Sequence, residues 1–341
     1  MKIAVALSGG VDSSFAAFKL KSEGNEVKAF TFKVNNIFDT NRAKIVAEAL
    51  GIEHHTIDIS KAFNEKIINY FVSAYLKGYT PNPCAICNRE IKSDLFIKEI
   101  LKFENFDYFA SGHYVEKVEY RGKELLKEHK DRKKSQTYFL SLIKPSALKK
   151  LIFPLENEIK ENVKKIMLEN FSEIFKEEKE SFEVCFIKEQ KYYNFIRKRI
   201  REKRRKGYFV DSKGKILGEH SGFYKYTIGQ RRGLRISAGE KLYVYKIEPE
   251  KNLVFLGDEG LLMKKYFFTK NINWFLKPDS NEKFSVRTRF RGERILVEKI
   301  EESEDRYKIS LSSSLKAITP GQLASFYIDE YLIGGAIIER D

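Results

Sequence analysis

The stretch ALSGGVDSS (residues 6–14) completes the apolar run IAVAL (residues 3–7) and opens the segment DSSFAAFKLKSEG (residues 12–24), whose apolar residues have helical spacing. A buried strand, a glycine turn and a helix in this order direct backbone N–H groups toward an anion. The helix that starts near Asp12 adds roughly half a positive charge at its N-terminus. The stretch therefore predicts a phosphate-binding loop.

Glycine and hydroxyl side chains make up the turn itself. Gly9 and Gly10 let a ligand approach the backbone closely, and hydroxyl donors come from Ser8, Ser13 and Ser14. The loop is not a Walker A loop, because no Gly-Lys-Ser/Thr follows, and it is not the G-x-G-x-x-G dinucleotide fingerprint. It resembles the pyrophosphate loop of ATP pyrophosphatases, which adenylate a substrate and release pyrophosphate. The plainer alternative is a strand-to-helix turn capped by serines.

Short apolar runs alternate with helical patterns through residues 1–145. That alternation is typical of an α/β domain with a doubly wound parallel sheet, covered by helices on both faces. The expected strands are 3–7, 26–32, 52–59 and 106–114, and the expected helices are 12–24, 40–51 and 63–78.

The rest of the chain predicts two further domains. Residues 146–238 contain charged helical stretches such as KENVKKIMLENFSEIF and are expected to form a small, largely helical, basic central domain. Residues 239–341 alternate with period two, as in KLYVYKIEP, NLVFLGD and LASFYI, which predicts a C-terminal β-barrel.

Composition narrows the class of protein. Of the 341 residues, 42% are hydrophobic, and no apolar run approaches the roughly 20 residues that cross a bilayer. The opening MKIAVALSGG reaches its glycine turn too soon for a signal peptide, so we expect a cytoplasmic protein. The net charge of +15 suggests a polyanionic partner, although a lysine-rich proteome would give the same surplus. Three cysteines, an odd number, argue against a disulfide framework and for metal binding or catalysis.

The segment YTPNPCAICNREIKSDLF (residues 79–96) presents two of the three cysteines. Its prolines rule out a helix before Cys84, so we expect a rigid loop that delivers Cys84 and Cys87 at the start of a helix. A helix N-terminus lowers the pKa of a thiol below its free value of about 8.5, and Arg89 and Lys92 act in the same direction. The segment therefore predicts reactive thiolates.

The third cysteine, Cys185, lies about a hundred residues further on, among apolar neighbours. A lone cysteine in such surroundings is most often a small buried hydrophobe. Alternatively, a histidine could complete a zinc site with all three cysteines, since structural zinc takes four ligands. The residues alone leave these alternatives open.

Seven stretches together resemble one family along nearly the whole chain. They are SGGVDSS, TPNPCAICNREIK, SGHY, KKSQTYFL, VCFI, YTIGQRRGL and TPGQLASFY, and they run from residue 8 to residue 327 in the family's order. The family is the bacterial tRNA-specific 2-thiouridylases, which install sulfur at C2 of the wobble uridine of certain tRNAs. The resemblance implies an ATP pyrophosphatase domain, a small central domain that contacts tRNA, and a C-terminal β-barrel.

The resemblance also implies roles for individual residues. Cys87 matches the nucleophilic cysteine, and Cys185 matches the cysteine that carries a persulfide. The residues at ATP-contact positions are Ala6, Leu7, Ser8, Gly9, Gly10, Val11, Asp12, Ser13, Phe32 and Gly112. The residues at the target base are Asn82, Pro83 and Cys84, and those at other tRNA-contact positions are His113, Lys134, Ser135, Gln136, Arg289, Phe290 and Gln322. ATP is expected as a substrate, together with Mg²⁺.

The implied chemistry suits these residues. The C2 carbonyl of uridine is a poor electrophile, and adenylation turns its oxygen into a leaving group. A persulfide on Cys185 would then attack C2, and Cys87 would release the sulfur by forming a Cys87–Cys185 disulfide that must be reduced before the next turnover. The expected sulfur donor is a persulfide relay protein or hydrosulfide.

The chain departs from the family pattern at two positions, because Cys84 and Ser135 each stand where the better-known pattern has an aspartate. The first change creates Cys-x-x-Cys opposite Cys185. Three thiolates at one site are typical of a [4Fe–4S] cluster with one open iron. We interpret Cys84, Cys87 and Cys185 as ligands of such a cluster, with hydrosulfide on the open iron as donor. The alternative is the persulfide route with Cys84 as a bystander.

Residues 197–207, RKRIREKRRKG, contain eight basic residues among the first ten and have aromatic residues on both sides. Such a run usually marks a solvated helix face, but few acidic residues interrupt it, and we interpret it as a surface that follows RNA phosphates. YTIGQRRGL (residues 226–234) is expected to continue this surface. Specificity should come from the anticodon loop of the tRNA, whose unstacked bases can enter a site.

Three alternative functions share some of these features. An ATP-dependent amidating ligase would share the phosphate loop but needs an ammonia source, and no glutaminase domain is visible. A non-catalytic RNA-binding protein would leave the loop and the cysteines without a role. A thiolase acting on another base or RNA keeps the same chemistry. We expect a monomer that binds tRNA across all three domains and has no membrane partner.

Overall fold

The N-terminal part of the chain forms a five-stranded parallel sheet. The computed structural model describes residues 1–341 except 36, 177–183, 188–190, 201–205 and 238. Every neighbouring pair of strands in this sheet is parallel, so the predicted parallel sheet is confirmed. The order is β3 (Glu53–Asp58), β2 (Glu26–Lys33), β1 (Lys2–Ala6), β4 (Tyr108–Ala110) and β7 (Leu151–Ile152).

Helices cover both faces of this sheet because its central strand is apolar on both sides. Ile3 and Val5 are fully buried on one face, and Ala4 is fully buried on the other. The first face is covered by α1 (Val11–Ser22), α2 (Asn41–Leu50) and α9 (Lys160–Phe175). The second face is covered by α3 (Ser60–Phe63), η1 (Asn64–Ile68), α4 (Asn69–Leu76), α5 (Pro83–Cys87), η2 (Asn88–Leu95) and α6 (Phe96–Ile100).

Helix α9 packs on the N-terminal sheet, whereas its charged sequence suggests a place in the central domain. Val163 and Met167 are fully buried in the same core as Ile3 and Val5, and the helix lies against α1. The charges of α9 therefore mark only its outer face, and the sequence does not reveal which sheet the apolar stripe covers.

The central domain is built on a four-stranded sheet, not on helices. The short helix η3 (Phe223–Lys225) accompanies the sheet, whereas helix α10 (Tyr192–Arg199) packs on α4 of the N-terminal domain through Tyr192 and Phe195. The period-two pattern groups β10 and β11 with the barrel, but Val254 and Leu256 share a small core with Phe209 and β11 pairs with β8 instead. The order is β10 (Tyr243–Glu248), β11 (Leu253–Gly257), β8 (Gly207–Val210) and β9 (Ile216–His220).

Six antiparallel strands close into the predicted C-terminal barrel, which is thereby confirmed. Pairing between β12 and β18 closes the ring. The short strand β13 (Asn273–Trp274) also pairs with β18, and η4 (Glu259–Leu262) leads into β12. The order around the barrel is β12 (Met263–Thr269), β16 (Arg306–Lys316), β15 (Ile295–Ser303), β14 (Ser285–Arg287), β17 (Leu323–Ile328) and β18 (Tyr331–Glu339).

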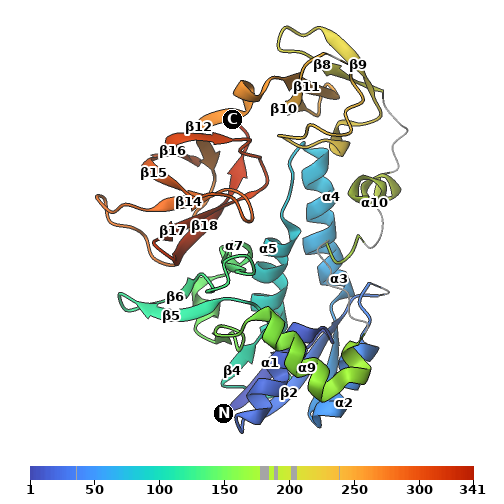
Figure 1. Ribbon diagram of the computed structural model, residues 1–341, viewed down its shortest axis with the longest axis vertical. Coiled ribbons are helices and arrows are strands. Elements are labelled where there is room, and N and C mark those ends of the chain that lie inside the picture. The colour runs from blue at the N-terminus through green and yellow to red at the C-terminus, as the bar shows by residue number, and fades with distance from the viewer. Residues whose placement is uncertain (36, 177–183, 188–190, 201–205, 238) are drawn as a thin grey trace.

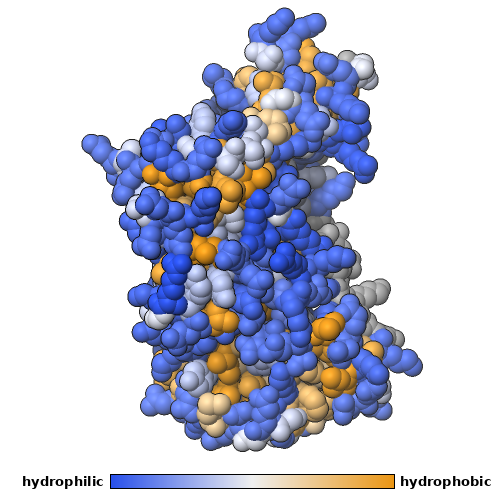
Figure 2. Space-filling view, turned by 60° about the vertical axis from the view of Figure 1, so that its left-hand side comes forward, coloured by the Kyte–Doolittle hydropathy of each residue, from blue (hydrophilic) through white to orange (hydrophobic). Residues whose placement is uncertain are grey.

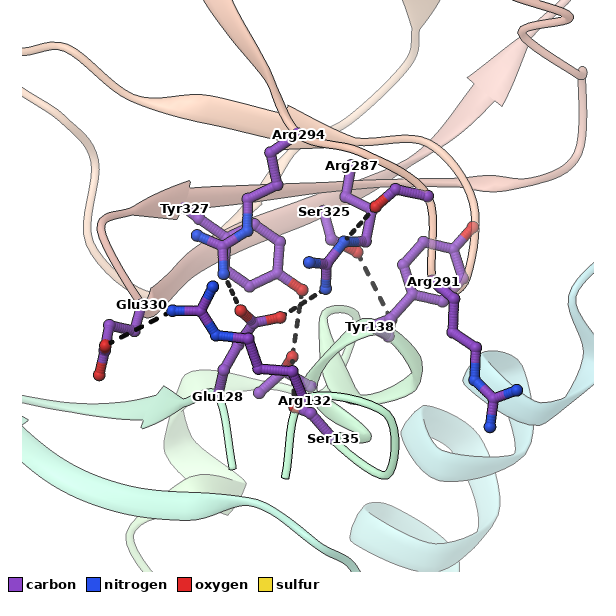
Figure 3. A network of polar contacts seen from close by, with 12 residues as sticks. Glu128, Arg132, Ser135, Tyr138, Arg287, Arg291, Arg294, Ser325, Tyr327 and Glu330 are labelled. Carbon is purple, nitrogen blue, oxygen red and sulfur yellow. Dashed lines mark hydrogen bonds and ion pairs between the residues drawn. The ribbon is translucent and has the colours of Figure 1, made fainter. Parts of the chain in front are cut away.

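The N-terminal domain is joined to the barrel by a hairpin and by a buried carboxylate. The hairpin of β5 (Glu116–Tyr120) and β6 (Lys123–Lys127) pairs with β18 and extends its sheet. Directly after β6, the carboxylate of Glu128 binds the guanidinium groups of Arg287 and Arg294 from the barrel (Figure 3). The segment then continues through α7 (Thr137–Leu140) and α8 (Pro145–Leu148) to β7.

The three domains form three lobes, with α4 reaching from the N-terminal lobe toward the central one (Figure 1). Hydrophilic residues dominate the face shown in Figure 2, and hydrophobic residues lie among them in separate groups. None of the helices that the structure describes is both long enough and apolar enough to cross a membrane.

Candidate active site

The loops that follow β1 and β4 meet at the centre of the sheet. The strand order reverses there, and ligands of such sheets bind at this switch point, beyond the carboxyl ends of the strands. Gly112, after β4, lies directly against the start of α1. A Cβ atom on Gly112 would be 2.8 Å from the backbone nitrogen of Ser13, so only glycine fits this close approach.

The predicted strand, turn and helix around SGGVDSS are all present. Gly9 adopts a φ of +79°, and a Cβ atom there would be 2.8 Å from the backbone nitrogen of Ala43. The hydroxyl of Ser13 accepts a hydrogen bond from the backbone N–H of Ser8 at 3.1 Å and donates to the carbonyl of Gly10 at 3.0 Å. These contacts fix the shape of the loop at the N-terminus of α1.

Lys160 is a loop neighbour that the sequence does not predict. Its ammonium lies 2.5 Å from the carboxylate of Asp12, and its side chain is only 8% exposed. The hydroxyl of Tyr114 donates to the same carboxylate at 2.8 Å. Lys160 is 148 residues from Asp12 along the chain and begins α9, so no local spacing could have pointed to it. The phosphate loop thus has a buried lysine beside it, although it lacks the lysine of a Walker A loop.

Cys84 and Cys87 lie at the start of a helix, α5, as the proline-containing loop before them predicts. Pro83 begins the helix, and the side chain of Asn82 accepts a hydrogen bond from the backbone N–H of Ala85 at 3.1 Å. Cys84 and Cys185 are exposed, Cys87 is partly buried, and all three are free thiols. Both thiols lie in α5, and the helix then continues as the wider π-helical stretch η2.

The prediction of low thiol pKa values is wrong. Desolvation by the surrounding protein raises the pKa of Cys87 to about 12 and that of Cys185 to about 11, and it also raises the pKa of Cys84. Repulsion between the cysteines adds to the increase for Cys87 and Cys185, while Lys92 lowers the pKa of all three thiols. For Cys87, desolvation therefore outweighs the helix N-terminus and the charge of Lys92.

The three cysteines lie close enough to affect one another electrostatically. Among the residues that the structure describes, however, no group of three or more His, Cys, Asp or Glu side chains is placed to hold a metal ion. In this arrangement Cys84, Cys87 and Cys185 do not fit the three-cysteine ligand set of a cluster.

A small, mostly apolar pocket of about 30 Å³ lies at the carboxyl ends of β1 and β4. Ala6, Ser111 and His113 line it at the ends of β1 and β4, and Asn88 and Lys92 line it from η2. The Nδ1 atom of His113 is hydrogen-bonded to the hydroxyl of Ser111 at 2.8 Å. Burial, followed by the charge of Lys92, holds the pKa of His113 well below its ordinary value, so the ring is neutral at neutral pH.

Phe32 lies on β2 and packs against the thiol-bearing helix. Its ring centroid is 4.2 Å from that of Phe96, at the start of α6. This places Phe32 beside the pocket on the side of the sheet that carries the cysteines.

The stretch Lys134-Ser135-Gln136 is tied to the loop after β4. The side-chain oxygen of Gln136 accepts a hydrogen bond from the backbone N–H of Tyr114 at 2.9 Å. The backbone N–H of Gln136 in turn donates to the carbonyl of Tyr114 at 3.0 Å. Ser135 is buried, and its hydroxyl accepts from the backbone N–H of His129 at 3.3 Å. Ser135 and Gln136 therefore have defined structural contacts, and Lys134 and Gln136 are each partly exposed.

The barrel holds the loop that precedes Cys84. The side chain of Gln322 donates to the carbonyl of Thr80 at 2.8 Å, and the backbone N–H of Thr80 donates to the carbonyl of Pro320 at 2.8 Å. Arg289 donates to the carbonyl of Ala317 at 2.6 Å from the same part of the barrel.

Phe290, next to Arg289, is 37% exposed, and its ring centroid is 4.6 Å from that of Phe139 in α7. Phe290 therefore presents an aromatic surface to solvent at the junction between the barrel and the N-terminal domain.

The two predicted basic segments are described only in part. Of residues 197–207, positions 201–205 lie outside the described residues; Arg199 donates to the side chain of Asn64 at 3.1 Å. In the segment 226–234, Arg231 and Arg232 are exposed, and Arg231 lines a surface hollow together with Arg235 and Lys241.

Comparisons with known proteins match the chain from end to end. The family models are the tRNA methyl transferase HUP domain over residues 1–189, the tRNA methyl transferase PRC-barrel domain over 193–258 and the aminomethyltransferase beta-barrel domain over 264–338. A 4-thiouridine synthetase solved with RNA and bound ATP is 15% identical over 58% of this chain and 50% of that chain, with a TM-score of 0.38, too low to bear on function.

Relatives that match along their full length are more informative about the family than this solved structure. The tRNA-specific 2-thiouridylase MnmA of Aquifex aeolicus is 37% identical across 100% of this chain and 99% of its own length. The tRNA-specific 2-thiouridylase MnmA 2 of Thermoanaerobacter sp. is 38% identical across 99% of this chain and 98% of its own. At this identity over the full length, the chain belongs to the family of tRNA-specific 2-thiouridylases.

Proposed function

We propose that this protein is an ATP-dependent enzyme that replaces the C2 oxygen of the wobble uridine in tRNA with sulfur. One observation carries the proposal: the glycine loop stands at the switch point of the parallel sheet, and the three cysteines of the chain lie close enough together to affect one another electrostatically. Family membership supports the same substrate and reaction.

The first step is adenylation of the uridine. The O2 atom attacks the α-phosphorus of ATP, an O–P bond forms, and the bond to the pyrophosphate breaks. The turn around Gly9 and Gly10 and the N-terminus of α1 receive the phosphates, and residues at the other expected ATP contacts, such as Gly112, shape the site. Lys160 adds a buried positive charge there, and Mg²⁺ would accompany the nucleotide.

Sulfur transfer follows in two steps on the cysteines. A donor persulfide passes its outer sulfur to the thiolate of Cys185, and the resulting persulfide anion attacks C2 while AMP leaves with the electron pair of the C–O bond. The thiolate of Cys87 then attacks the Sγ atom of Cys185, forming a disulfide and releasing the sulfur on the base as a thiocarbonyl. An external dithiol returns two electrons and two protons to the disulfide.

The route through Cys185 persulfide is favoured over the cluster route by the positions of the thiols. No metal site is formed among the described residues, and no step above needs iron. Iron and acid-labile sulfide, measured on protein purified without oxygen, test this choice. We expect no stoichiometric iron; about four irons per chain, lost in a Cys84→Ala variant, would establish the cluster instead.

The tRNA contacts are proposed to involve all three domains. The expected target-base residues Asn82, Pro83 and Cys84 lie on the loop that the barrel holds through Gln322 and Thr80. His113 lines the small pocket, and exposed Phe290 and half-buried Lys134 lie along the junction of the N-terminal domain and the barrel. A monomer provides every residue named here, and the donor is proposed to be a persulfide relay protein.

The function is tested by incubating the protein with ATP, a persulfide donor and an unmodified tRNA, followed by mass spectrometry of the digested nucleosides. We expect 2-thiouridine at the wobble position and one AMP per sulfur. Sulfur on another base or in another RNA would support the nearest alternative, a thiolase of different specificity.

A further inference from the structure

Lys92 lies in η2, the π-helical stretch that follows Cys87. The backbone N–H of Phe96 donates to the carbonyl of Ile91, five residues back, as in a π-helix. In an α-helix with 3.6 residues per turn, residues five apart point about 140° away from each other. In the wider turn of a π-helix, residues five apart lie nearer to one face of the helix than they do in an α-helix. The wider turn therefore directs Lys92 toward the side of the helix that carries Cys87.

The pocket shows what Lys92 faces there. Lys92 and Asn88 line it from η2, while Ala6, Ser111 and His113 line it from the ends of β1 and β4. The lysine thus borders the carboxyl edge of the sheet, where β1 and β4 end. The electrostatic effects of Lys92 on the three thiols and on His113 agree with this position.

Lys92 has no acidic partner within the part of the chain that the structure describes, although it is half-buried. Its neighbours on the same helical stretch do have partners: Arg89 pairs with Glu90 at 2.8 Å, and Lys98 pairs with Asp94 at 2.9 Å. A partly desolvated cation without a partner is costly, so the pocket favours an anionic ligand.

The proposed reaction brings one anion close to the cysteines at the right stage. When sulfur attacks C2, the C2–S bond forms and the bond from C2 to the oxygen of AMP breaks. Negative charge therefore moves from the sulfur to the phosphate of AMP. A fixed ammonium group between the two stabilises that charge in the transition state.

We propose that Lys92 is the cation that holds the phosphate of the adenylated uridine beside the cysteines during sulfur transfer. The inference rests on the proposed function and assigns a step within it. The phosphate loop and Lys160 serve adenylation, whereas Lys92 serves the departure of AMP.

Single-turnover kinetics with α-labelled ATP, a persulfide donor and an unmodified tRNA can separate the two steps. The variants are Lys92→Met, Lys92→Arg and, as the matched control, Lys98→Met on the same helical stretch, where the side chain is 64% exposed. Label attached to tRNA measures adenylation, and 2-thiouridine measures sulfur transfer. ATP affinity is measured separately by calorimetry.

We expect Lys92→Met to slow conversion of the adenylate to 2-thiouridine by about 100-fold, the loss typical of a transition-state charge stabiliser. Labelled tRNA then accumulates, ATP affinity is unchanged, Lys92→Arg restores most of the rate, and Lys98→Met matches the unaltered protein. Wild-type conversion by Lys92→Met would overturn the proposal, and so would a joint loss of ATP binding and both steps that Lys92→Arg does not restore. If the unaltered protein formed no 2-thiouridine, the proposed function itself would fail instead.

Discussion

Cys87 is subject to two opposing effects, and burial is the stronger. The N-terminus of α5 and the charge of Lys92 favour its thiolate, but desolvation raises its pKa to about 12. In the free enzyme the thiol is therefore protonated at neutral pH. Because oxidation requires the thiolate, this protonation protects a cysteine that must later form a disulfide. The sequence contains the helix start and the cation but not the burial, which comes from the packing of distant segments.

The raised pKa of Cys87 predicts the pH dependence of its alkylation. The thiolate is the reactive form, so the rate of carboxymethylation should rise about tenfold per pH unit. It should reach no plateau below pH 9, because the pKa is near 12. The measurement uses a Cys84→Ser, Cys185→Ser variant, in which Cys87 is the remaining cysteine. A plateau near pH 7 would show a stabilised thiolate and contradict this view of the site.

Lys160 is predicted to contribute to ATP binding. Lys160→Met removes the buried positive charge beside Asp12 and should weaken ATP binding by about 10-fold or more, since hydrogen bonds to charged groups contribute about 1.5–3 kcal/mol. Calorimetric titration with ATP measures the effect. Lys165→Met, on the exposed face of the same helix, is the control and should bind ATP normally. Equal affinities for the two variants would remove Lys160 from the phosphate site.

At the scale of elements, local patterns identify strands and helices but not their distant partners. The run IAVAL, the glycine turn and the following helix could be predicted because each depends on neighbouring residues. The pairing of β11 with β8 and the packing of α9 on α1 depend on segments far apart in the chain. The sequence likewise predicts Cys84 and Cys87 on a helix. It does not predict the π-helical stretch η2, which turns Lys92 toward the side of Cys87.

The contact between Glu128 and the barrel is predicted to set the stability of the domain junction. The side chain of Glu128 is 2% exposed and binds both Arg287 and Arg294. Glu128→Gln leaves two partly buried guanidinium groups without their carboxylate, which should cost about 3 kcal/mol. Thermal unfolding should show a lower midpoint for this variant.

Glu330→Gln is the matched control for that junction, because Glu330 is 46% exposed and pairs with Lys127 and Arg132 (Figure 3). An exposed pair contributes at most about 1 kcal/mol, so this variant should unfold close to the unaltered protein. Equal midpoints for the two variants would show that the buried carboxylate does not hold the domains together.

At the scale of the whole molecule, a net charge of +15 and three lobes suit a large polyanion. We predict that tRNA binding weakens steeply with salt, with a log–log slope of about −3 or steeper, because several phosphates release counterions. An Arg231→Ala, Arg232→Ala variant should make the slope shallower by about one to two units, and a Lys44→Ala, Lys165→Ala variant should not. A slope near zero for the unaltered protein would exclude an electrostatic docking surface.

The central claim is that one site joins ATP-dependent activation to sulfur transfer by Cys87 and Cys185. The most direct measurement is nucleoside mass spectrometry of a tRNA incubated with ATP, a persulfide donor and either the unaltered protein or its Cys87→Ser or Cys185→Ser variant. The account predicts 2-thiouridine at the wobble position with the unaltered protein and adenylated tRNA without 2-thiouridine with Cys185→Ser. With Cys87→Ser it predicts that AMP leaves and the base stays linked to Cys185 through the sulfur–sulfur bond. Full thiolation by either variant, or thiolation without ATP, would contradict it.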